Sequence, residues 1–259
     1  MHKERFGRIV MMKGYPDTVG PLETLPAEAS TMAYMDEDAL IREQMEYYRV
    51  RAPEYDVTSA PPIDRLGAYA RRIEMALDRF RPTGNVLEIA SGTGLWTIHL
   101  LRHAPSITAL DSSSEMHELS RIKTGGDPRV HYVLADVFSW QPNGRYDVVF
   151  FADWLSHVPP GGFDRFWATV RAALAPAGRV FFVDELEDAW KYGDPFRETF
   201  AGDPSVPVVY RTVSDGRAFR VVKVYWNPEQ LWSTLTAMGW DAEIHTAGPF
   251  FWAEAVPMD

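Results

Sequence analysis

Residues 85–94 read NVLEIASGTG, a short apolar run followed by a turn of small residues that contains Gly92 and Gly94. The run predicts a strand buried on both faces, as in a parallel sheet covered by helices on each side. The glycines let the main chain approach a ligand without a Cβ in the way, and a helix beginning there presents free amide groups. The stretch therefore indicates an α/β fold with a nucleoside site at the end of this strand.

A Gly-x-Gly turn is also compatible with two further kinds of structure. One is an ordinary loop between a strand and a helix. The other is the dinucleotide-binding fold, whose fingerprint is G-x-G-x-x-G with an acid about 20 residues further on. Thr97, preceded by Trp96, stands in the place of the third glycine, and these larger side chains would obstruct the close contact between helix and strand. Asp111 fits a ribose-binding acid in either fold.

Glu88 lies inside the strand and ahead of the glycines. With this acid, a spacer and the Gly-x-Gly turn in that order, the sequence resembles the class I S-adenosylmethionine-dependent methyltransferases of the bacterial small-molecule type. The resemblance runs from about Tyr47 to the C-terminus. It implies a Rossmann-like, doubly wound seven-stranded sheet, mostly parallel with an antiparallel C-terminal strand, and S-adenosylmethionine as the cofactor.

Composition narrows the class of substrate. Hydrophobic residues make up 46 % of the 259, as in a globular protein, and no cysteine is present, so disulfides and thiolate metal sites are excluded and we expect no metal. Neither an apolar run of 18 residues nor a signal peptide is visible, so we expect a cytoplasmic protein without a membrane span. The net charge of −10 argues against nucleic acid, because phosphate backbones bind basic surfaces. The expected acceptor is a small molecule, and the oligomeric state is not predicted.

The chain divides into an irregular N-terminal extension, 1–35, and a single methyltransferase domain, 36–259. Within the domain we expect a helical lid, 36–80, and a core, 81–259, with a hairpin insertion at about 186–226. Pro53 should end the first lid helix. The expected helices are 36–51, 64–80, 95–103, 113–121, 162–174 and 228–238. The expected strands are 85–90, 106–110, 130–134, 146–151, 179–183, 208–213, 218–226, 241–246 and 249–254, with Asp215-Gly216 as the turn of the late hairpin.

The resemblance assigns roles to acids at successive strand ends. Asp111 would accept the ribose hydroxyls, although it could instead cap the next helix, and Asp136 would bind the adenine amino group unless it is only a turn residue. The tyrosine-rich segment 47–55 resembles an entry segment that folds over the cofactor, where tyrosine rings suit a sulfonium; one or two of these rings could equally be core. The expected cofactor-binding residues are Tyr47, Arg51, Glu88, Ala90, Gly92, Gly94, Trp96, Asp111, Ser112, Met116, Asp136, Val137, Phe138 and Phe151.

The chemistry should take place beyond the carboxyl ends of the strands, where a sheet of this kind binds its ligands. Asp153 and His157 follow the fourth core strand and are candidate bases, although His157 could be a structural residue; Tyr55 is the third catalytic candidate, and Asp184 and Glu185 are weaker choices as bases. In the late hairpin, Arg211 and Lys223 would face one another and suit an anionic acceptor, unless they form a solvated face. The expected substrate-binding residues are Tyr47, Trp154, Arg211 and Lys223.

The sequence therefore predicts a metal-independent methyltransferase that acts on an oxygen or nitrogen of a small metabolite. The hairpin segment is similar to one in a branch of bacterial enzymes that act on antibiotic and phosphonate intermediates, which suggests natural-product biosynthesis. Two alternatives are an NAD(P)-dependent oxidoreductase and a cofactor-binding but inactive accessory subunit.

Overall fold

A computed structural model describes residues 9–10, 36–59, 63–186, 199–200 and 207–258. Apart from residues 9–10, the expected N-terminal extension lies outside the described residues. The helices are α2 (Glu37–Arg51), α3 (Tyr55–Ser59), α4 (Ile63–Phe80), α5 (Thr97–Leu100), α6 (Ser114–Lys123), α7 (Phe163–Ala173) and α8 (Pro228–Ala237), with 3-10 turns η1 (Ala52–Glu54), η2 (Leu155–His157) and η3 (Pro160–Gly162). The strands are β1 (Ile9–Val10), β2 (Asn85–Ile89), β3 (Ser106–Asp111), β4 (Val130–Leu134), β5 (Tyr146–Ala152), β6 (Leu174–Glu185), β7 (Thr199–Phe200), β8 (Val208–Thr212), β9 (Ala218–Val222), β10 (Trp240–Ala247) and β11 (Phe250–Pro257).

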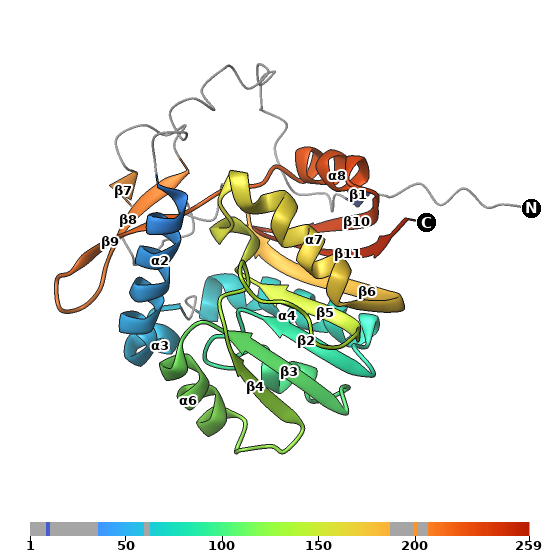
Figure 1. The fold of residues 1–259 in the computed structure, drawn as a ribbon, viewed down its shortest axis with the longest axis horizontal. Coiled ribbons are helices and arrows are strands. Elements are labelled where there is room, and N and C mark those ends of the chain that lie inside the picture. The colour runs from blue at the N-terminus through green and yellow to red at the C-terminus, as the bar shows by residue number, and fades with distance from the viewer. Residues whose placement is uncertain (1–8, 11–35, 60–62, 187–198, 201–206, 259) are drawn as a thin grey trace, which may run out of the picture.

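The main sheet has the strand order β1-β10-β11-β6-β5-β2-β3-β4 (Figure 1). Only β11 runs antiparallel to its neighbours, β10 and β6, whereas the other described pairs in this sheet are parallel. The expected seven-stranded, mostly parallel sheet is confirmed, with the two-residue β1 added at its edge. The chain order reverses beside β2, which pairs with β3 on one side and β5 on the other. A crevice beyond the carboxyl ends of these strands is where such a sheet binds ligands.

Helices cover both faces of this sheet, which is why its central strands are apolar on both sides. On one face, α7 and α8 pack over Phe151 and Phe182, with Trp167 fully buried between them and Trp240. On the other face, α4 and α5 pack over the neighbouring residues Phe150 and Phe181. Because successive strand side chains point to opposite faces, each aromatic pair serves both layers of the core.

The late hairpin forms a separate three-stranded sheet, β7-β8-β9, rather than joining the main sheet. Its turn lies at the expected place, with Gly216 at φ 89° and a hydrogen bond from the amide of Val213 to the carbonyl of Arg217. The expected antiparallel C-terminal strand of the main sheet is β11. The strand 218–226 also ends early, at Val222, because the amide of Val224 leaves the ladder to bond the carbonyl of Ser156 in η2. Helix α2 stands beside β8 and β9 in Figure 1.

Two helical segments lie near the N-terminal side of the site. The first lid helix ends at Arg51, as expected, and Pro53 follows it in the first turn of η1, where no amide hydrogen is needed, before the chain continues into α3. The helix after the glycine turn is shorter than the expected 95–103, because only Thr97–Leu100 is α-helical and the chain then turns toward β3.

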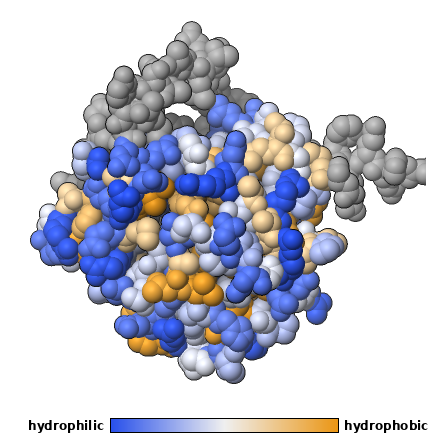
Figure 2. Space-filling view, viewed as in Figure 1, coloured by the Kyte–Doolittle hydropathy of each residue, from blue (hydrophilic) through white to orange (hydrophobic). Residues whose placement is uncertain are grey.

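Figure 2 shows a mostly hydrophilic face, and large exposed apolar side chains such as Val57, Ile122 and Leu134 lie on different elements. Within the described part of the chain, no helix is both long and apolar enough to cross a membrane.

Candidate active site

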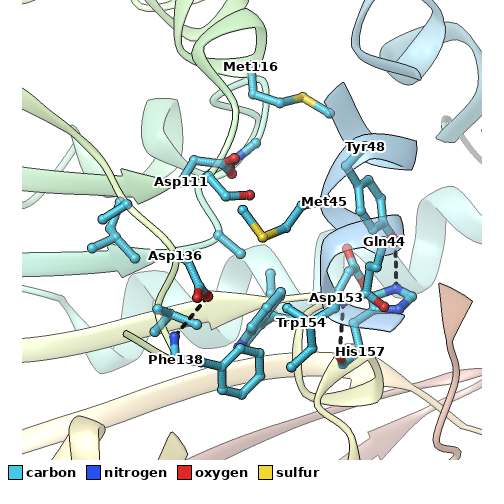
Figure 3. Close-up of a pocket in the computed structure, with 18 of the residues that line it drawn as sticks. Gln44, Met45, Tyr48, Asp111, Met116, Asp136, Phe138, Asp153, Trp154 and His157 are labelled. Atoms are coloured by element: carbon cyan, nitrogen blue, oxygen red, sulfur yellow. Dashed lines mark hydrogen bonds between the residues drawn. The ribbon is translucent and has the colours of Figure 1, made fainter. Parts of the chain in front are cut away.

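A cavity lies beyond the carboxyl ends of the central strands, between the main sheet and α2. Its empty volume is ≈ 710 Å³, part of it open to solvent, which suits a cofactor with a small second molecule. Residues from the strand ends line one side, and α2 and η2 line the other (Figure 3). The expected residues that line it are Tyr55, Ala90, Gly92, Asp111, Ser112, Met116, Asp136, Val137, Phe138, Asp153, Trp154 and His157.

The two glycines of the turn have different tasks. Both have positive φ, 53° at Gly92 and 81° at Gly94, where L side chains are strained. A Cβ at Gly92 would meet only the carbonyl of Ala90 at 4.0 Å, so this position leaves the cavity open. A Cβ at Gly94 would clash with the side chain of Ser120 on α6. Gly92 thus provides room for a ligand, whereas Gly94 permits α6 to pack.

Asp111 ends β3 and faces the cavity (Figure 3). Its Oδ2 accepts a hydrogen bond from the amide of Gly92 at 2.8 Å, and its Oδ1 accepts one from the amide of Ser113 at 2.9 Å. The helix cap is Ser113, whose hydroxyl accepts from the amide of Met116. Asp111 therefore is not the N-cap, and its fixed carboxylate retains lone pairs for two hydroxyl groups.

Asp136 follows β4, forms a turn and also lines the cavity. Its Oδ1 accepts from the amide of Phe138 at 3.0 Å, and its carbonyl accepts from the amides of Ser139 and Trp140. The turn aims the carboxylate into the cavity beside the Phe138 ring (Figure 3). A nucleobase that stacks on this ring could donate a hydrogen bond from its amino group to Asp136.

Glu88 and Trp96, by contrast, lie beneath the cavity. The Glu88 carboxyl is buried and accepts a hydrogen bond from the hydroxyl of Thr97 at 2.7 Å. Burial raises the pKa of Glu88 to about 8, so the group is mostly protonated at neutral pH. Trp96 packs against Phe150 in the core. Thr97, in place of a third glycine, thus supplies the partner of the buried acid.

Tyr47 does not line the cavity, contrary to the expectation. It is 1 % exposed and packs with Val209, Val221 and Phe219 of the hairpin. The next residue, Tyr48, faces the cavity instead.

The sequence did contain a signal for the face of α2 that meets the cavity, namely the helical spacing of its residues. Residues 41, 44, 45 and 48 lie on one face of α2, and their i, i+3, i+4, i+7 pattern marks that face. The lining residues that sequence reasoning missed are Ile41, Gln44, Met45, Tyr48, Leu110, Ala135 and Ala152.

Three further expected residues are also outside the cavity lining. The Arg51 guanidinium lies 4.9 Å from the ring centre of Tyr55 and donates to the hydroxyl of Thr58, so it supports a lining residue from behind. Phe151 is fully buried in the core under α7, where it stacks on Phe182. Gly94 serves the packing of α6 described above.

His157 is held by both ring nitrogens. Its Nδ1 lies 2.7 Å from the carbonyl of Val222, which can only accept, so Nδ1 carries the proton. Its Nε2 therefore accepts from the Tyr48 hydroxyl at 2.8 Å, and the Tyr48 oxygen accepts from Nη1 of Arg211 at 3.2 Å. Burial, then the charges of Lys223 and Arg211, lower the pKa of His157 well below its usual value. The ring is neutral and a weak base.

Asp153 reaches the cavity from the end of β5. It adopts φ 50°, a strained conformation for a non-glycine residue, which turns its exposed side chain into the cavity (Figure 3). The side chain is open to the cavity, but protein atoms surround it on the other sides, and this loss of hydration, followed by the carboxylates of Asp184 and Glu185, raises the pKa of Asp153 to about 8. At neutral pH most Asp153 side chains are uncharged hydrogen-bond donors.

Arg211 and Lys223 do not face one another, because Arg211 pairs with Phe219 in the hairpin register. Both are buried behind the cavity wall: Arg211 contacts the Tyr48 hydroxyl, and Lys223 Nζ bonds Glu185 at 2.7 Å and the hydroxyl of Ser156 at 3.3 Å. They are not a solvated face, and they do not line the cavity. Arg211 contacts Tyr48, and the charges of Arg211 and Lys223 act on His157, so both cations influence residues that line the cavity.

Comparisons with known proteins agree with this geometry. Residues 63–242 match the family model described as "Methyltransferase domain". A solved structure described as "DhpI-SAH complex structure" is 39 % identical, with a TM-score of 0.73, and the match covers 85 % of this chain and 98 % of that one. A second, "DhpI-SAM-HEP complex", is 41 % identical with the same TM-score of 0.73, over 84 % of this chain and 98 % of the other.

The curated relatives are matched over a smaller part of their length. Malonyl-[acyl-carrier protein] O-methyltransferase 1 of Ilyobacter polytropus is 30 % identical over 83 residues, 31 % of each chain. Malonyl-[acyl-carrier protein] O-methyltransferase 2 of the same organism is 28 % identical over 154 residues, 55 % of each chain. The chain thus spans about a third to half of these relatives.

Proposed function

Because the chain belongs to the methyltransferase-domain family, with the class I fold of its S-adenosylmethionine-dependent members, we propose that it methylates an oxygen of a small anionic metabolite. This membership replaces the oxidoreductase alternative. The oxygen target, the anionic acceptor and a place in natural-product biosynthesis are the proposed part.

The described residues fit the cofactor. The open space at Gly92 would hold the amino-acid part of S-adenosylmethionine. The carboxylate of Asp111 would bind the ribose, and the carboxylate of Asp136, beside Phe138, would bind the adenine. Bound S-adenosylmethionine supplies an electrophilic methyl group on a positively charged sulfur. Tyr55, which lines the cavity and is held by Arg51, presents an aromatic ring where such a cation would be stabilised.

The observation that carries the acceptor proposal is the neutral His157 ring with cations behind it. Lys223, Arg211 and Arg51 each lower the pKa of His157, so the potential at the His157 ring is positive, whereas Asp184 and Glu185 make it negative at Asp153. A positive potential attracts an oxyanion and disfavours a protonated amine. An uncharged Asp153 and the ring of His157 beside Tyr48 then present hydrogen-bonding groups rather than a strong base.

The chemistry of an oxyanion needs no base. A lone pair of the acceptor oxygen forms the new O–C bond while the electrons of the C–S bond pass to sulfur, so one negative and one positive charge are neutralised and no proton is released. The protein has to align the oxygen with the methyl carbon and exclude water. A phenol or an ammonium would first have to lose a proton, and the low pKa of His157 makes it a poor acceptor for that proton.

The names of two relatives support oxygen as the target. The Ilyobacter proteins are named O-methyltransferases of a malonyl group, which ends in a carboxylate. The DhpI structures carry SAH or SAM in their descriptions, at identities of 39 % and 41 %.

The test is transfer of tritium from methyl-labelled S-adenosylmethionine to matched probe acceptors. We expect labelled product with methylphosphonate, ethylphosphonate or malonate, and none with neutral ethanol or with ethylamine. Methylation of the amine alone would refute the proposal. Tight binding of S-adenosylhomocysteine without transfer to any acid of a broad panel would favour the inactive accessory subunit instead.

A further inference from the structure

Gln44 is a buried polar side chain of α2 that the proposed chemistry does not use. It is 2 % exposed, and its amide bonds two elements far apart in the chain. Its Nε2 donates to the carbonyl of His157 at 3.1 Å, and its Oε1 accepts from the amide of Val222 at 3.0 Å. The orientation of the amide is forced, because the first partner can only accept and the second can only donate.

These bonds close a ring around His157. Val222 receives the side-chain oxygen of Gln44 on its amide and the Nδ1–H of His157 on its carbonyl. The main chain of His157 is bonded to the other end of the same Gln44 amide. Thus one side chain binds the main chain of the histidine and the amide of the residue whose carbonyl fixes the histidine proton. Figure 3 shows Gln44 beside Tyr48 and above His157.

From this geometry we propose that Gln44 is a positioning residue, which keeps His157 in the Nδ1–H tautomer. In this tautomer Nε2 accepts a hydrogen bond from Tyr48, at the end of the cavity where the methyl acceptor is proposed to bind. The relevance to catalysis rests on the proposed function, whereas the effect on the tautomer does not. Without Gln44, the position of Val222 depends on the hairpin alone, and the Nε2–H tautomer competes. In that tautomer Nε2 cannot accept from Tyr48, so the Tyr48 hydroxyl would lose its acceptor while still accepting from Arg211.

The neighbouring Glu43 provides a matched control, because it joins the same helix to the same strand without touching His157. Its Oε1 accepts from the amide of Arg220 at 2.6 Å, and its Oε2 accepts from Nε of Arg220 at 2.8 Å. Glu43→Met loosens the contact between α2 and β9 as Gln44→Met does. Only the second change removes the bonds that lead to His157.

The experiment measures the tautomer of His157 by nitrogen NMR in the full chain labelled with ¹⁵N-histidine, at pH 8, with His157→Gln to assign the signals. We expect the parent and Glu43→Met to show Nδ1 protonated. In Gln44→Met the share of the Nε2–H tautomer should rise at least about fivefold, as expected for the loss of one hydrogen bond.

An unchanged tautomer in Gln44→Met, or an equal change in both variants, would overturn the assignment. If circular dichroism shows Gln44→Met to be unfolded, Gln44→Glu decides, since it keeps an acceptor for Val222 and loses the donor to His157. A rise of the Nε2–H tautomer there supports the proposal, and no rise overturns it. None of these results depends on the acceptor, so they leave the proposed function to its own test.

Discussion

Replacing Glu88 by glutamine should make the protein more stable, and increasingly so as the pH rises. Glu88 is 2 % exposed, accepts one hydrogen bond from Thr97, and lies in the field of Asp111. Burial, then the Asp111 charge, favour its neutral form and raise its pKa to about 8. Glutamine has nearly the same shape, keeps an oxygen for the Thr97 hydroxyl, and does not titrate.

The magnitude follows from the two pKa values. Below pH 4.5 the carboxyl is protonated in both the folded and the unfolded parent, so its titration adds nothing. Between 4.5 and about 8 the unfolded chain releases a proton that the folded chain keeps, and the parent loses about 1.4 kcal/mol of stability per pH unit. Above pH 8 the loss levels off at about 5 kcal/mol, an order-of-magnitude figure.

The assay is urea unfolding of the parent and Glu88→Gln at pH 5.5, 6.5 and 7.5. The stability difference in favour of glutamine should grow by about 3 kcal/mol over this range. All other titrating groups are common to both proteins and cancel in the difference. A difference that stays constant with pH would show that Glu88 titrates normally and refute the account of a neutral acid beneath the glycine turn. Binding of S-adenosylhomocysteine should change less than threefold, because Glu88 does not line the cavity.

Three further predictions concern the site itself. Asp111→Asn should weaken S-adenosylhomocysteine binding in calorimetry at least tenfold, since charge-assisted hydrogen bonds contribute about 1.5–3 kcal/mol; unchanged affinity would remove Asp111 from the ribose site. Gly94→Ala should lower the melting temperature through its clash with Ser120, whereas Gly92→Ala should chiefly weaken cofactor binding; the reverse order in thermal unfolding and calorimetry would contradict the division between the two glycines. Methylation of an oxyanion should slow as pH rises through about 8, because ionised Asp153 repels the acceptor, and a pH–rate profile of Asp153→Asn that keeps the same decline would exclude this cause.

Local signals in the sequence were enough for the side of the cavity formed by the strand ends. The strand, the glycine turn and the acids at the ends of β3 and β4 are each defined by a few adjacent residues, and parallel strands bring their carboxyl ends to one edge. Asp111, Asp136 and Gly92 therefore line the cavity as a short pattern would place them.

Helix α2 was only partly interpretable from its sequence. Its existence follows from its composition and its cap at Asp36, but which face meets the cavity depends on where the hairpin packs. Tyr47 and Tyr48 are adjacent and equally suited to a pocket in chemical terms. Packing of β8 and β9 against Tyr47 decides that Tyr48 is the one that faces the ligand.

The sequence by itself determined the class of fold, the cofactor and the glycine turn, because each depends on contacts between residues close together in the chain. Only the tertiary structure decided which residues surround His157, at the end of the cavity where the acceptor is proposed to bind. Gln44, His157 and Val222 are in contact there although they lie 65 to 178 residues apart in the sequence. The tertiary structure also decided that Glu88 and His157 are neutral, since burial and distant charges, rather than residue type, set their protonation. No periodicity of the sequence encodes such contacts, because they form only when the hairpin and α2 pack against the rest of the fold.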